Sequence, residues 1–62
     1  MKTSELIKIL KKQAGATFLK HGGEHDFYYC PKTGNIVQVH RHQAKEVPTG
    51  TANKILRDAG LK

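Results

Sequence analysis

The sequence predicts a small α+β domain in which a helix, three antiparallel strands and a second helix follow one another. Two segments, residues 3–14 and 49–59, carry apolar residues at the spacing of three and four that indicates a helix. Between them lie three short stretches rich in β-forming residues, separated by turns that contain glycine. A chain of 62 residues is long enough for one domain only, so residues 1–62 are expected to form a single two-layer unit with both helices on one face of the sheet.

The first helix is expected to begin at Thr3 or Ser4, because either hydroxyl can accept a hydrogen bond from a free amide at the helix start. Gly15 follows the helical pattern, and glycine is typical of the position just after a helix end. The predicted buried stripe consists of four residues at helical spacing, Leu6, Ile9, Leu10 and Ala14. The face predicted to be solvent-exposed carries three lysines, Lys8, Lys11 and Lys12.

Three strands are predicted over residues 16–20, 25–30 and 35–40. Residues 21–24 contain two adjacent glycines and are expected to turn the chain between the first two strands. A second turn is expected at Pro31-Lys32-Thr33-Gly34, which has proline early and glycine late. The second and third strands should therefore pair as an antiparallel hairpin. The sequence leaves open whether Phe27 or Tyr28 points to the core, since neighbours along a strand face opposite sides.

The second helix is expected to follow Val47-Pro48, with Thr49 as its N-cap and Gly60 as the residue that ends it. Its predicted apolar face consists of Ala52, Ile55, Leu56 and Ala59. Lys54 and Asp58 are four residues apart, so they are predicted to form an ion pair on the outer face of this helix.

The charge of the chain favours a polyanionic partner. Eleven lysines and arginines oppose five acidic residues, which gives a net charge of +6. Such an excess on a small domain favours nucleic acid as the partner, although it also raises solubility by itself. A single cysteine excludes an internal disulfide and a zinc site made only of cysteines. Lysines interrupt the N-terminal segment and the longest apolar run covers only residues 27–30, so we expect no signal peptide, no membrane span and a cytoplasmic location.

Four histidines are the main candidates for chemistry, in the pairs His21 with His25 and His40 with His42. A histidine exchanges protons near neutral pH, and RNA carries its own nucleophile in the 2′-hydroxyl. A general base, a nearby cation and correct positioning could therefore suffice to cleave RNA on an open surface. The acidic residues on either side of His25 are candidates to orient its ring.

Two other interpretations of these residues stay open. His21 and His25 could begin a metal site, with Cys30 and the later histidines as further ligands, but their spacing crosses two glycines and does not favour it. Alternatively, the domain could bind RNA without cleaving it, with Tyr28 and Tyr29 stacking on bases. Cys30 itself is expected to be a small buried or half-buried strand residue.

Four segments in order carry a resemblance to a known family. They are KTSELIK at residues 2–8, GEHDFYYCP at 23–31, VQVHRH at 37–42, and VPTGTA with ILRDAGL at 47–52 and 55–61. Together they resemble the HicA family of toxins from bacterial toxin–antitoxin pairs over nearly the whole chain. The second segment is similar to the family's Gly-Ser-His-x-x-aromatic-x-x-Pro signature, with Glu24 in place of the usual serine.

The resemblance implies a fold like that of the double-stranded-RNA-binding domain. It also implies a ribonuclease that cleaves mRNA and arrests translation, needs no cofactor or metal, and is covered by a cognate HicB antitoxin. The family's catalytic histidine matches His25, which is therefore the expected general acid or base. The rival from another class is a non-catalytic RNA-binding module of the same fold.

The expected RNA contacts surround His25. Lys20, Arg41 and Lys45 are the candidates for phosphate contacts. Gly23, together with the preceding glycine, is expected to turn the backbone so that His25 is presented, and to let RNA approach closely.

Overall fold

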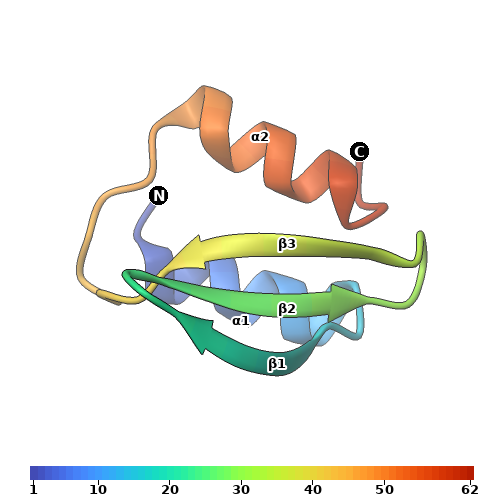
Figure 1. The fold of residues 1–62 in the computed structure, drawn as a ribbon. Helices are drawn as coiled ribbons and strands as arrows, with labels where there is room; N and C mark the ends of the chain where they lie inside the picture. The colour runs from blue at the N-terminus through green and yellow to red at the C-terminus, as the bar shows by residue number, and fades with distance from the viewer.

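The structure, a computed structural model, describes all 62 residues and has the predicted order of elements. These are α1 (Thr3–Gln13), β1 (Thr17–Gly22), β2 (His25–Cys30), β3 (Asn35–His40) and α2 (Thr49–Asp58). The strands form one antiparallel sheet in the order β1-β2-β3. Figure 1 shows α1 behind the sheet and α2 running along the β3 side. The predicted α+β architecture, like that of a double-stranded-RNA-binding domain, is confirmed. None of the helices has the length and apolar character that a membrane crossing requires.

The core lies between the two helices and one face of the sheet. Along β2, Tyr28 is 5% exposed and Cys30 is fully buried, whereas Tyr29 between them is exposed. Tyr28 therefore points to the core, which answers the question that the sequence left open. From α1, Leu6 and Leu10 fill the layer beneath the sheet with no exposed surface.

The sheet departs from the prediction at the first hairpin. The bounds predicted for β2 and β3 are confirmed, but β1 begins at Thr17 and continues through Gly22. The connecting turn is therefore only Gly23 and Glu24, and Gly23 has a φ of +61°, which glycine adopts without strain. The register of β1 on β2 shifts at Leu19, where the strand carries a bulge.

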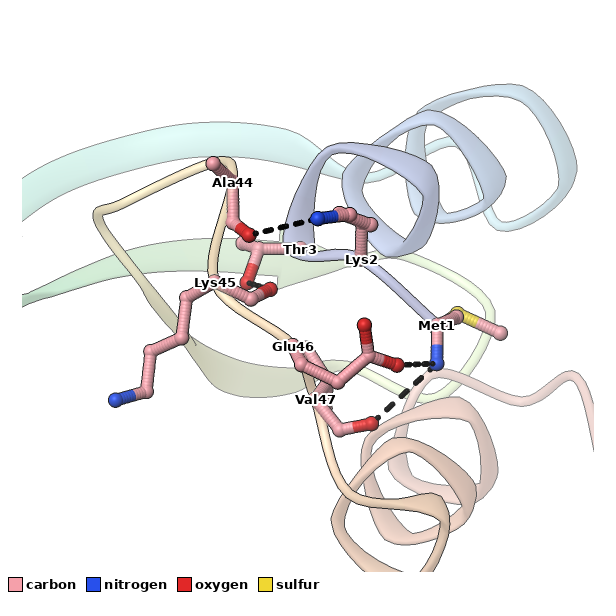
Figure 2. Close-up of polar contacts among 7 residues, drawn as sticks. All are labelled: Met1, Lys2, Thr3, Ala44, Lys45, Glu46 and Val47. Carbon is pink, nitrogen blue, oxygen red and sulfur yellow. Dashed lines mark hydrogen bonds and ion pairs between the residues drawn. The ribbon is translucent and has the colours of Figure 1, made fainter.

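The predicted N-caps are wrong for both helices. Thr3 and Thr49 are the first helical residues, and neither helix has a side-chain hydrogen bond at its cap. The amides of Thr3 and Ser4 instead donate to the carbonyls of Lys45 and Gln43, at 2.9 and 3.0 Å. The Thr3 hydroxyl donates to the same Lys45 carbonyl at 2.9 Å (Figure 2). A loop distant in sequence thus satisfies the start of α1, which needs no capping side chain.

The predicted helix ends and most of the predicted helix faces are confirmed. Gly15 and Gly60 directly follow the last turn of α1 and α2 with φ values of +64° and +90°. In α1, however, Ile7 is buried and Ile9 only half-buried, so the inward stripe is rotated from the predicted one. All four predicted apolar residues of the second helical segment are buried: Ala52, Ile55, Leu56 and Ala59. On the outer face of α2, the predicted ion pair of Lys54 and Asp58 forms at 2.9 Å.

Candidate functional site

Three of the four histidines meet at one end of the sheet. His25 begins β2 and His40 ends β3, and the antiparallel register places them opposite each other. Their ring centroids are 5.4 Å apart in an edge-to-face arrangement. His42 stacks on His40 at 5.6 Å with an angle of 28° between the ring planes. We call His25, His40 and His42 the histidine cluster.

The surroundings of His40 favour its neutral form and one tautomer of its ring. The backbone N–H of His42 donates to Nδ1 of His40 at 3.3 Å, so a neutral His40 ring carries its proton on Nε2. Desolvation lowers the pKa of His40, and the neighbouring Lys45, His25 and His42 side chains lower it further, while the Glu24 carboxylate acts in the opposite direction. His40 is therefore neutral at pH 7 and presents an Nε2–H donor.

The lowered pKa of His40 predicts how stability depends on pH. An unfolded histidine titrates near pH ~6.5. Because the folded state holds the proton less tightly, this contribution to stability is present above that pH and is lost as the pH falls through the lower folded-state pKa. Urea unfolding between about pH 7.5 and about pH 5 should therefore show a steeper loss of stability for the wild type than for His40→Gln, which cannot titrate. If the free energy of unfolding depended on pH in the same way for both proteins, the lowered pKa of His40 would be contradicted.

A shallow pocket of about 140 Å³ opens beside the histidine cluster, between β3, the start of α2 and the loop at residues 45–48. His25 and His40 line it, together with Gln38, Lys45 and Thr51. The structure therefore brings the predicted catalytic residue and one predicted phosphate contact to the same pocket. Sequence analysis missed Gln38, although strand alternation counted from His40 would have placed it on the same face of β3.

The loop that carries Lys45 is bonded to the first residues of the chain by an ion pair and a hydrogen bond. The N-terminal ammonium pairs with the Glu46 carboxylate at 2.8 Å and lowers the pKa of that carboxyl group. The Lys2 ammonium donates to the carbonyl of Ala44 (Figure 2). The Lys45 side chain makes none of these contacts and extends away from them (Figure 2), and Lys45 is one of the residues that line the pocket.

The fourth histidine belongs to a separate group, on the face of the sheet that packs against the helices. Nδ1 of His21 is 2.5 Å from Oδ1 of Asp26, and Nε of Arg41 is 3.9 Å from the same oxygen. Asp26 is 9% exposed, so its carboxylate is held by two cationic or donating groups as burial requires. The expectation that Asp26 orients His25 is therefore wrong: the two residues are neighbours in β2 and face opposite sides.

The other predicted RNA contacts lie apart from the pocket. The Arg41 guanidinium donates to the carbonyl of Gly23, and the Arg41 amide donates to the carbonyl of Glu24 at 2.9 Å. These two hydrogen bonds stabilise the turn that precedes His25. Gly23 is exposed, with open space where a side chain would be. Lys20 lies farther along the sheet, with Nζ 5.3 Å from the centroid of the Phe27 ring.

Cys30 does not join the histidines. It is fully buried beneath the helices, and burial, followed by the charge of Asp58, raises the pKa of its thiol. His21 is held by Asp26 instead of converging with His25. No group of three histidine, cysteine or acidic side chains has the geometry to hold a metal ion.

A family model described as HicA toxin of bacterial toxin-antitoxin matches residues 3–61, nearly the whole chain. The chain belongs to the HicA toxin family. No individually curated protein matches it. As a HicA toxin it is the toxic member of a toxin–antitoxin pair, and its partner is a cognate antitoxin.

Within this HicA toxin, the residue that departs from the family signature lies at the edge of the histidine cluster. Glu24 is exposed in the two-residue turn before His25. Its carboxylate acts on His40 by raising that pKa, against the larger effects that lower it. The pKa of His40 is thus lowered despite the acidic residue at position 24.

Proposed function

We propose that this HicA toxin is an endoribonuclease that cleaves mRNA, with His25 as the general acid or base at the scissile phosphate. One observation carries the proposal: His25 lies half-buried at a pocket that it shares with His40 and Lys45. The net charge of +6 supports a polyanionic substrate. The resemblance of residues 23–31 to the family signature assigns the same histidine.

The chemistry needs only groups that this site offers. His25 takes the proton of a ribose 2′-hydroxyl, and the resulting oxygen attacks the adjacent phosphorus. The bond from phosphorus to the 5′-oxygen breaks, and that oxygen takes up a proton from water while His25 returns its proton to the solvent, which leaves a 2′,3′-cyclic phosphate and a 5′-hydroxyl. The Lys45 ammonium and the Nε2–H of His40 stabilise the negative charge that builds on the phosphate oxygens.

The proposal is tested by the integrity of RNA. A long single-stranded RNA incubated with the purified protein in EDTA should be cut into fragments that end in 2′,3′-cyclic phosphates. RNA that shifts on a native gel but keeps its length would contradict the proposal and favour the alternative, a non-catalytic RNA-binding module of the same fold. If the protein cleaved RNA without EDTA but not with it, the reaction would require a metal ion that the proposed mechanism does not include.

We also propose that the antitoxin is HicB-like, covers the pocket, and restrains the toxin in the cytoplasm, where mRNA is translated. Family membership supports the pairing, and the exposed position of Lys45 supports contact with an acidic partner.

A further inference from the structure

The face of the sheet opposite the helices is uncovered and carries aromatic side chains. Phe27 and Tyr29 lie on the central strand β2 and project from this face, since the residues between and beside them are buried in the core. On β3, Ile36 pairs with Tyr29 and Gln38 pairs with Phe27. Tyr29 is 38% exposed and Ile36 57% exposed, so the surface is accessible. We call Lys20, Phe27, Tyr29, Ile36 and Gln38 the open face.

Phe27 has a defined position on the open face. A β-carbon added to Gly22 would lie 2.3 Å from Cε2 of Phe27, so the ring occupies the space that the missing side chain leaves on β1. The Lys20 ammonium lies 5.3 Å from the ring centroid. The Phe27 ring therefore supports the Lys20 ammonium, which lies over it, while the more exposed ring of Tyr29 is accessible to a base.

The open face carries no carboxylate. Four of the five acidic side chains lie away from it: Glu5 on α1, Glu24 in the turn, Asp26 toward the helices and Glu46 at the N-terminal ammonium. The fifth, Asp58, borders Ile36 and Gln38 at the α2 edge, where it is paired with Lys54 at 2.9 Å. The one carboxylate that borders this surface is therefore offset by a lysine, and the net charge of the chain attracts a polyanion.

We propose that the open face is a binding track for single-stranded RNA, in which a base stacks on Tyr29 and the backbone is contacted by Lys20, whose ammonium is positioned over the Phe27 ring. Unpaired bases are the favoured occupant because aromatic rings on a sheet surface stack on bases that a duplex would hide. The track leads to the pocket, because β2 runs from Tyr29 back to His25 over four residues, about 13 Å at the rise of a strand. The inference rests on the proposed function for what happens to the RNA at His25, but binding on the track is independent of cleavage.

The track is tested by binding in a protein that cannot cut. In the His25→Ala background, the affinity for a short fluorescent single-stranded RNA should fall about tenfold when Tyr29 is also replaced by alanine. Phe18→Ala is the matched control, since Phe18 is an aromatic residue of similar exposure (45%) whose ring packs edge-on against Tyr28 on the helix side of the sheet. This control should bind as tightly as the parent. Lys20→Ala should weaken binding and reduce its dependence on salt.

Several results would overturn the track. The first is equal RNA affinity for the folded Tyr29→Ala and Phe18→Ala proteins, and the second is no RNA binding by the His25→Ala parent. The third is a Tyr29→Ala protein that keeps its affinity for RNA but no longer binds the antitoxin. The last result would make the open face a protein-docking surface. A wild type that binds RNA through Tyr29 without cutting it would contradict the proposed ribonuclease and leave the track supported.

Discussion

Replacing His25 with alanine is expected to lower the rate of RNA cleavage by about 100- to 10,000-fold, the usual contribution of a general acid or base. The fold should survive, because His25 is only half-buried, starts a strand and lies outside the cluster of core residues. Its ring contacts His40 across the strand pair, and that contact can be lost without opening a cavity in the core. Cleavage is measured as the initial rate of fragment formation from a long single-stranded RNA.

The matched control for this substitution is His21→Ala. His21 is a histidine of the same sheet that lies in β1, before the turn at Gly23 and Glu24. Its side chain pairs with Asp26 and does not join the histidine cluster. We expect His21→Ala to retain cleavage within a fewfold of the wild type. Circular dichroism and urea unfolding of both variants separate lost chemistry from lost structure. A folded His25→Ala protein that cuts RNA as fast as the His21→Ala protein would remove His25 from the mechanism.

Replacing Leu10 with alanine is expected to reduce the free energy of unfolding by about 2 to 5 kcal/mol. Leu10 has no exposed surface and lies in the core between α1 and the sheet, so truncation leaves a cavity there. A domain of this size without disulfides has a net stability of only about 3 to 5 kcal/mol. A large fraction of the Leu10→Ala protein should therefore be unfolded in the absence of denaturant.

Leu19→Ala supplies the same chemical change at an accessible position. Leu19 lies at the bulge of β1 and is 46% exposed, so its truncation should change stability by no more than about 0.5 kcal/mol. Urea titrations followed by circular dichroism measure both variants. Comparable losses at Leu10 and Leu19 would contradict the packing described for α1.

The parts of the fold that depend on local pattern were predictable. The bounds of β2 and β3 follow from β-forming residues between two turn signals, and the apolar face of α2 follows from spacing. The end of α1 at Gly15 follows because that position needs a left-handed backbone, which glycine adopts freely.

The parts that depend on distant contacts were not predictable. Thr3 or Ser4 was predicted as the cap because either hydroxyl suits that position, yet a loop about forty residues away supplies the acceptors. The meeting of His25 with His40 requires the register of β2 on β3, which no local signal specifies to one residue. The hydrogen bond between Asp26 and His21 likewise depends on which face of the sheet each side chain occupies.

The hydrogen bonds between the start of α1 and the loop before α2 have a consequence for the order in which the chain can fold as it is synthesised. The amides of Thr3 and Ser4 find their acceptors only at Lys45 and Gln43, and the intervening chain must be made first. Since the N-terminal residues leave the ribosome first, the amides that open α1 can be hydrogen-bonded only to water until that loop emerges. The same loop brings Lys45 to the pocket. A nascent chain interrupted before this point therefore has neither a finished first helix nor the pocket's cation, and a truncated product of this toxin is expected to be harmless to the cell that makes it.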